Sequence, residues 1–151
     1  MYFAVVGHYS YWAVICVVGC ESTLNPSKNN KKKKILFVDD DLDTTWLSKR
    51  VLERNGFEVQ TFESPMSALE NFKPGSYDLL LTDIKMREMD GFELYDKLRK
   101  LDSNINVCFL TAAQEYYNKY NERYSWLQKK CFITKPITLE NLVNTINSIL
   151  S

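Results

Sequence analysis

Short apolar runs alternate with amphipathic stretches along most of this 151-residue chain. The runs have the length and composition of strands, and we predict strands at 35–38, 57–62, 78–82, 105–110 and 131–134. The run at 35–38 is apolar throughout, which is typical of a central parallel strand covered on both faces. The run at 57–62 alternates apolar and polar residues and is expected nearer the edge of the sheet.

The stretches between these runs predict helices. After the first run, Leu47, Val51 and Leu52 recur at helical spacing. Ser64 and Thr138 each precede an apolar stripe and are expected to cap a helix. The other stripes are Ala68, Leu69 and Phe72; Phe92, Tyr95 and Leu98; and Leu139, Leu142, Val143, Ile146 and Ile149, with a further helix expected at 114–130. Strand and helix alternate five times, which predicts an α/β fold with a doubly wound parallel sheet and helices on both faces.

Four of the apolar runs stop at a residue with reactive chemistry. Asp39 and Asp40 follow the first run, Asp83 and Thr111 end the third and fourth, and Lys135 follows the fifth. The carboxyl ends of parallel strands meet at one edge of a sheet, where ligands bind. Adjacent carboxylates are tolerated when a divalent cation lies between them, and ligands that are all oxygen suit Mg²⁺. These residues therefore predict a site for Mg²⁺ and a phosphoryl group.

Each residue of this set has a separate expected role. Asp83 is the candidate phosphoacceptor, because a carboxylate can attack phosphorus to form an acyl phosphate. Lys135 would bring a compact cation to the phosphoryl oxygens, and the hydroxyl of Thr111 would donate a hydrogen bond to one of them. Asp41 and Asp43 are expected to serve the N-terminus of the following helix, where negative charge is favourable.

The order Asp-Asp, Asp, Thr, Lys-Pro, with helix-length spacers, resembles the receiver domain of two-component response regulators. The resemblance runs from about Lys34 to the C-terminus and includes Met89-Asp90-Gly91, which opens the helix after the third strand. It implies a five-stranded parallel sheet of flavodoxin-like strand order 2-1-3-4-5. We therefore divide the chain into an N-terminal segment, 1–33, and a receiver domain, 34–151.

The resemblance also implies how the site is assembled. Asp40, Asp83 and the backbone carbonyl of Lys85 would bind Mg²⁺ directly, and Asp39 would act through water. The Lys135–Pro136 peptide bond is expected to be cis. These assignments follow from the family and not from the spacing alone.

Phe132 lies three residues before Lys135, where receivers carry an aromatic residue whose rotamer follows the threonine, here Thr111. Phenylalanine has no hydroxyl, so a switch at Phe132 would operate by packing alone. The alternative is an ordinary core aromatic. Two departures stand out: Arg87 replaces the usual proline, and 128–131 lacks the usual Gly-Ala pair.

The family implies the partners as well. A sensor histidine kinase or a phosphotransfer protein would supply the phosphoryl group, and the domain would catalyse its own phosphorylation and dephosphorylation. The signal would pass to a downstream protein, or to a second copy, through the face formed by the fourth helix, fifth strand and fifth helix. We expect a stand-alone receiver without an output domain, located in the cytoplasm.

Two other functions fit parts of the pattern. Asp41-Leu42-Asp43-Thr44-Thr45 matches the Asp-x-Asp-x-Thr string of haloacid-dehalogenase-type phosphatases. In those enzymes, however, the nucleophile comes first after the strand, where this chain has Asp39, and a late acidic pair is needed that does not follow Lys135. The second alternative is a degenerate receiver that binds partners without being phosphorylated.

Charge and cysteine content narrow the function further. Beyond Lys34 the chain has 14 basic and 18 acidic residues, which gives no electrostatic reason to bind nucleic acid. Cys108 and Cys131 lie in or beside apolar strands and are expected to be buried and reduced. Tyr2 to Cys20 contains no charged residue, since His8 is counted as neutral, and a lysine run follows it. The segment 1–33 is therefore either a membrane anchor that keeps the domain at the inner face of the membrane or a non-native extension.

Overall fold

The computed structural model describes residues 31–112, 124, 127 and 129–151, and Lys31–Ser151 form one compact unit. From β1 to β4 the described elements alternate between strand and helix as the sequence predicts. They are β1 (Lys34–Val38), α1 (Leu42–Arg54), β2 (Glu58–Phe62), α2 (Pro65–Glu70), β3 (Leu79–Asp83), α3 (Gly91–Leu101), β4 (Asn106–Thr111), the 3₁₀ turn η1 (Lys129–Cys131), β5 (Phe132–Thr134) and α5 (Leu139–Leu150).

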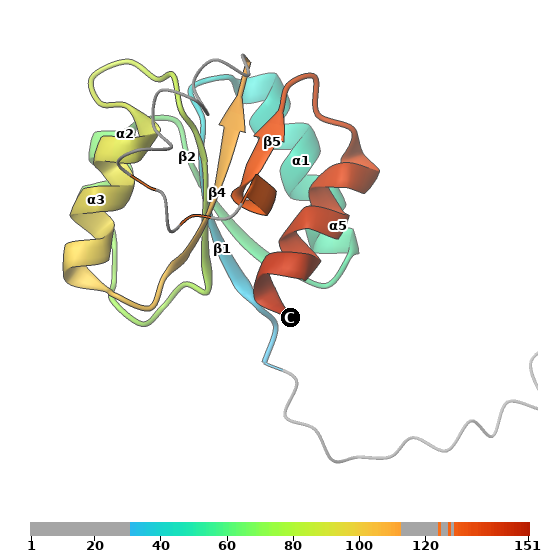
Figure 1. The fold of residues 1–151 in the computed structure, drawn as a ribbon, viewed down its shortest axis with the longest axis horizontal. Helices are drawn as coiled ribbons and strands as arrows, with labels where there is room; N and C mark the ends of the chain where they lie inside the picture. The colour runs from blue at the N-terminus through green and yellow to red at the C-terminus, as the bar shows by residue number, and fades with distance from the viewer. Residues whose placement is uncertain (1–30, 113–123, 125–126, 128) are drawn as a thin grey trace, which may run out of the picture. The chain divides into compact units, whose positions relative to one another are not determined.

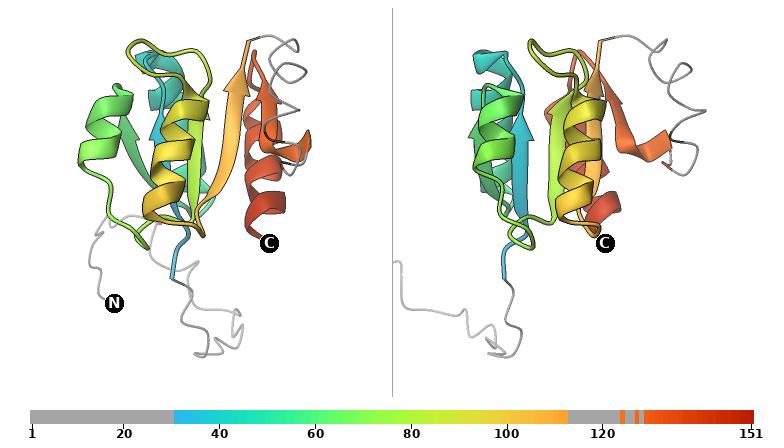
Figure 2. Two further views of the ribbon diagram at one scale, coloured as in Figure 1. Left: turned by 60° about the vertical axis from the view of Figure 1, so that its left-hand side comes forward. Right: turned by 90° about the vertical axis from the view of Figure 1, so that its left-hand side faces the viewer.

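The five strands form one parallel sheet in the order β2-β1-β3-β4-β5, which confirms the predicted topology. Helices α1 and α5 cover one face, and α2 and α3 cover the other (Figures 1 and 2). The strand order reverses direction after β1, so the connections from β1 and β3 leave toward opposite sides. In folds of this kind that reversal opens a crevice at the carboxyl ends of the strands.

The sheet separates two hydrophobic cores, because successive side chains of a strand point to opposite faces. In β1, Leu36 and Val38 pack into the core beneath α2 and α3, whereas Ile35 and Phe37 pack into the core beneath α1 and α5. All four are fully buried. The unbroken apolar run of β1 is therefore explained by coverage on both faces, as predicted.

The helices begin at residues whose side chains accept backbone N–H groups. Ser64 accepts from Ser67, and Thr138 accepts from Asn141, so both predicted N-caps are confirmed. Asp41 caps α1 by accepting from Asp43 and Thr44, which confirms its expected place at a helix N-terminus. Such caps typically stabilise a helix by about 1 kcal/mol.

Helix α1 does not bury the stripe that its spacing suggested. Leu52 is buried, but Leu47 is 47% exposed, and the other buried residues of the helix are Thr45 and Ser48. Trp46 is 61% exposed and stacks under the guanidinium of Arg50, 4.9 Å from its ring centroid. The small hydroxyl residues allow α1 to approach the sheet, while Leu42, Trp46 and Leu47 are exposed.

Some predicted segments fall partly or wholly outside the residues that the structure describes. The fourth helix at 114–130 and the segment at 1–30 lie outside them, apart from isolated positions within 114–130. Cys131 closes η1 and does not begin β5, which starts at Phe132. Cys108 and Cys131 are buried, as predicted. No helix in the described part of the chain has the length and apolar character needed to span a bilayer.

Asp78 ties together the amino ends of the central strands. One carboxylate oxygen accepts the backbone N–H of Lys34 at 2.8 Å, and the other accepts Nζ of Lys33 at 3.0 Å. Burial alone would raise the pKa of Asp78, but the hydrogen bonds from Lys34 and Lys33 outweigh it and lower the pKa below its ordinary value. The ionised form of Asp78 therefore stabilises the fold.

We predict that Asp78→Asn lowers the free energy of unfolding by about 1 kcal/mol at pH 7, a value reduced by partial solvent exposure. Because the folded pKa lies below the ordinary value of 3.8, the stabilisation is present above that pH and is lost as pH falls through the folded pKa. Urea denaturation at pH 7 and at pH 3 should show a difference that shrinks in acid. Glu70→Gln, at the exposed end of α2, is the control. An undiminished difference at pH 3 would contradict this assignment.

Candidate functional site

The register of the sheet brings Asp39 and Asp83 side by side. Val38 of β1 pairs with Thr82 of β3, so the next residue of each strand lies at the same level of the carboxyl edge. Asp39 is fully buried and Asp83 is nearly so. With Asp40, which is half-buried, they offer carboxylate oxygens that all lie within 4.8 Å of one another. The structure thus brings together the three acids that the sequence singled out.

Lys135 reaches this cluster from the far side of β4. Its Nζ donates to Asp83 at 2.8 Å and to Asp39 at 3.0 Å. Its backbone N–H donates to the carbonyl of Thr111 at 2.7 Å, which fixes the start of the chain after β5 against the end of β4. The Lys135–Pro136 bond is cis, as predicted. The ammonium therefore bridges two strands that are not neighbours of β5.

The charges of these groups depend on one another. Burial raises the pKa of Asp39, although the N–H of Asp41 and the charge of Lys135 oppose that rise. Burial alone would lower the pKa of Lys135, but hydrogen bonds and charges from Asp83 and Asp39 outweigh it and raise the pKa. The lysine therefore stays protonated, and three carboxylates share a cation that contacts two of them.

Thr111 ends β4 and Phe132 begins β5, the two strands that follow the strand of Asp83 in the sheet. Thr111 is buried at the end of β4, one residue beyond Leu110, which pairs with Asp83. Phe132 stacks on Phe109 with ring centroids 5.4 Å apart and also lies 6.3 Å from the ring of Phe92. Thr111 is thus near the phosphoacceptor candidate, and Phe132 is part of an aromatic cluster; its role as a switch stays a prediction.

The loop between β3 and α3 contains two features that the sequence analysis missed. The first is the close approach of Gly91, whose N–H donates to the carbonyl of Ile84 at 2.9 Å. A Cβ built on Gly91 would collide with the backbone carbonyl of Asp83. The second is an ion pair between Arg87 and Asp40, 3.5 Å apart. The Asp-Gly pair was a visible signal for the first feature, but no spacing rule predicts the second.

The same loop places Lys85, whose backbone N–H donates to Asp83 Oδ1 at 3.2 Å. This hydrogen bond joins the backbone of Lys85 to the side chain of the phosphoacceptor candidate, which lies two residues earlier in the chain. Whether its carbonyl also serves as a metal ligand stays a prediction.

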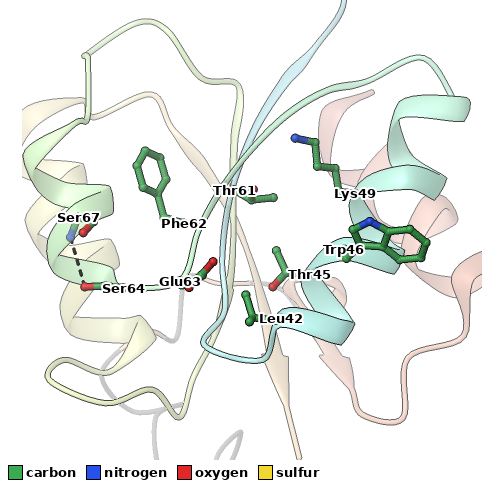
Figure 3. A pocket seen from close by; sticks show the side chains of 9 residues that line it. All are labelled: Leu42, Thr45, Trp46, Lys49, Thr61, Phe62, Glu63, Ser64 and Ser67. Atoms are coloured by element: carbon green, nitrogen blue, oxygen red, sulfur yellow. Dashed lines mark hydrogen bonds between the residues drawn. The ribbon is translucent and has the colours of Figure 1, made fainter.

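The acids do not line the cavity of about 580 Å³ shown in Figure 3. That cavity lies along the edge strand β2, between the exposed face of α1 and the start of α2, and its walls include Trp46, Thr61 and Ser64. The acidic cluster lies outside this cavity, at the carboxyl edge of the inner strands.

The donor set fits a hard divalent cation. Asp39, Asp40 and Asp83 offer oxygen ligands alone, in one cluster and at one edge. Mg²⁺ prefers this kind of site, with few carboxylates and with positions left for water and a phosphate oxygen. The carboxylates outnumber the cations that contact them, Lys135 and Arg87, so the cluster keeps an excess of formal negative charge that a divalent cation offsets.

The fold and the acidic cluster define a class of protein: an α/β domain with a carboxylate at the end of an inner strand and a lysine aimed at it. Residues 35–147 match the family model of the response regulator receiver domain. This chain therefore belongs to that family, as the motif order indicated. Receiver domains belong to two-component signalling systems and are phosphorylated on aspartate.

Proteins of known sequence agree with this membership. The response regulator receiver protein CpdR of Brucella abortus is 33% identical over 118 residues, which are 78% of this chain and 97% of CpdR. The sensor protein EvgS of Escherichia coli K12 is 37% identical over 112 residues, which are 74% of this chain but 9% of EvgS. The matching unit thus makes up nearly all of one relative and a small part of another.

Solved structures show the same fold. A receiver domain protein from Clostridium thermocellum is 28% identical with a TM-score of 0.67, and the match covers 78% of this chain and 94% of that one. The response regulator TrrA from Thermotoga maritima, in complex with Mg²⁺-BeF, is 30% identical with a TM-score of 0.66 and coverage of 78% and 99%.

We predict that Gly91→Ala destabilises the protein more than Gly75→Ala does. A methyl group at Gly91 would meet the backbone of Asp83, and such overpacking costs about 1–3 kcal/mol. Gly75 has open space around it, but its φ of 72° adds strain of about 1 kcal/mol. Chemical denaturation of both variants gives the comparison. Equal losses would show that the Asp83 carbonyl moves aside without cost.

Proposed function

We propose that this domain accepts a phosphoryl group on Asp83 from a histidine kinase or a phosphotransfer protein. The observation that carries the proposal is the clustering of Asp83 with Asp39, Asp40 and the ammonium of Lys135 at one sheet edge. A lone aspartate at a strand end has many structural uses. An aspartate whose carboxylate oxygen lies 2.8 Å from the ammonium of a partly buried lysine, beside two further acids, is arranged for chemistry.

In the proposed reaction, a carboxylate oxygen of Asp83 attacks phosphorus as the bond from phosphorus to the donor's imidazole nitrogen breaks. The product is an acyl phosphate on Asp83, and water later attacks phosphorus to release inorganic phosphate and restore the carboxylate. The Lys135 ammonium contacts Asp83 in the unmodified protein. It would therefore be close enough to donate a hydrogen bond to an oxygen of the phosphoryl group on Asp83. Thr111 would donate its hydroxyl to another of these oxygens.

The acids Asp39, Asp40 and Asp83, together with the backbone carbonyl of Lys85, would hold the metal ion. Mg²⁺ bound there supplies positive charge to the phosphoryl oxygens and offsets the repulsion between carboxylates. TrrA, solved with Mg²⁺-BeF, is a similar receiver and supports the choice of metal.

We predict that Asp83 is the residue modified when the protein is incubated with Mg²⁺ and acetyl phosphate. Peptide mass spectrometry should place the added phosphoryl group on Asp83, and Asp83→Asn should abolish it. Asp41→Asn is the matched control, because Asp41 caps α1 and is expected to retain labelling. Undiminished labelling of Asp83→Asn would refute the assignment, and labelling at Asp41 would favour the phosphatase-like pattern instead.

We further propose that phosphorylation is transmitted through Thr111 to Phe132 and to the face that includes β5 and α5. A dianionic group on Asp83 draws the Thr111 hydroxyl toward it, which changes the space beside Phe109 and hence the packing of Phe132. That face would bind the downstream protein, or a second copy of the domain. The coupling required is about 1–3 kcal/mol, as in other allosteric proteins.

Beryllofluoride with Mg²⁺ imitates the phosphoryl group and allows a direct test. We predict amide NMR shifts at Thr111, Phe132 and along α5, in addition to those around Asp83. In Phe132→Leu, which loses the ring but keeps an apolar side chain, the shifts along α5 should diminish while those around Asp83 persist. Shifts confined to the acids in the unmodified protein would mean that the site is occupied without transmission.

A further inference from the structure

Arg87 lies four residues after Asp83, in the loop that leads from β3 to α3. Its Nε lies 3.5 Å from Oδ2 of Asp40. The side chain of Arg87 is 89% exposed, and that of Asp40 is 28% exposed. The guanidinium thus approaches the acidic cluster from solvent, whereas the side chain of Lys135 is 22% exposed.

The two cations divide the three acids between them. Lys135 contacts Asp39 and Asp83, and Arg87 contacts Asp40. Asp40 is also the most exposed of the acids and a proposed direct ligand of Mg²⁺. A guanidinium and a metal ion at the same carboxylate repel each other, so metal binding must displace or weaken the Arg87 contact.

The loop holds the backbone of Arg87 while leaving its side chain free to move. Met89 is buried, and its N–H donates to the carbonyl of Arg87 at 2.8 Å. Glu88 has a φ of 69°, and its carboxylate accepts the hydroxyl of Ser64 at 3.0 Å. The guanidinium therefore has a fixed anchor and can leave Asp40 without rearranging the turn.

A displaced guanidinium has acids to move toward. A cavity of about 290 Å³ lies beside the pair and is lined by Asp40, Glu63, Ser64, Pro65, Arg87 and Glu88. Glu63 and Glu88 offer alternative carboxylates within the same cavity. Movement of the side chain by rotation about its own bonds therefore does not leave the charge without partners.

We propose that Arg87 is a positioning residue that competes with the divalent cation for Asp40 and thereby sets the Mg²⁺ concentration at which the site is filled. The inference rests on the proposed function, because it concerns the metal that Asp83 phosphorylation requires. Arg87 acts through Asp40 and need not touch the phosphoryl group. Because the pair is exposed, its effect is modest and falls as salt rises.

The test is a Mg²⁺ titration of the full chain, in which the amide NMR shifts of Asp40 and Lys85 report metal binding. Arg87→Gln, which removes the charge and keeps most of the length, should tighten Mg²⁺ binding about two- to fivefold at low ionic strength. Arg87→Lys, which keeps the charge, should change the affinity less. Arg54→Gln in the last turn of α1 removes an arginine far along the helix and controls for net charge.

A double-mutant comparison separates a contact through Asp40 from a general field. In the Asp40→Asn background, Arg87→Gln should change Mg²⁺ affinity by less than in the unmodified protein, because the shared carboxylate charge is gone. The gain from Arg87→Gln should also shrink when the titration is repeated at high salt.

The outcomes are distinct. An unmodified protein without Mg²⁺-dependent shifts would overturn the proposed function and this inference with it. Normal Mg²⁺ binding that is unchanged in Arg87→Gln would overturn the inference alone. An equal gain in Arg54→Gln, or the same gain with Asp40→Asn, would also overturn it, because the effect would then not pass through the pair.

Discussion

The contact of Lys135 with Asp39 and Asp83 is the interaction on which the site depends. Asp39 is fully buried, and a buried carboxylate without a partner costs several kcal/mol, by general estimates about 3–5 when a pair is broken. The ammonium spans from the end of β5 past β4 to β3 and β1, which makes the relative height of four strands a condition for satisfying one charge. The register of the strands therefore determines the geometry of the site.

That constraint explains why so many local features serve the carboxyl edge. The backbone N–H of Lys135 is held by Thr111, and the N–H of Asp41 is donated to the carboxylate of Asp39. The absence of a side chain at Gly91 lets α3 start against the carbonyl of Asp83. Each feature fixes a strand end by a hydrogen bond or by close packing, and the phosphoacceptor candidate lies where they converge.

The sequence was sufficient for the sheet, the caps and the acids because each is a local signal. Apolar runs covered on both faces predicted the strands, and Ser64 and Thr138 predicted helix starts. It was misleading for Leu47, because helical spacing identifies a stripe without saying which stripe meets the sheet. In α1 the small residues Thr45 and Ser48 face inward, and Trp46 faces outward. The Arg87–Asp40 pair was beyond prediction, since it joins two loops whose separation in space the spacing does not give.

The two cations of the site differ in how firmly they are held, and this difference assigns them different roles. Lys135 is largely buried, its pKa is raised by two carboxylates, and removing it would leave Asp39 with an unbalanced buried charge. Arg87 is almost fully exposed, so water replaces its contact at little cost, and exposed pairs are worth about 0–1 kcal/mol. A firmly held cation keeps Asp83 in place while the site is empty. One that leaves easily can respond to what binds. The acid at the solvent side, Asp40, is paired with the labile cation, which is the arrangement a site needs if it is to remain folded when empty and still accept a metal ion.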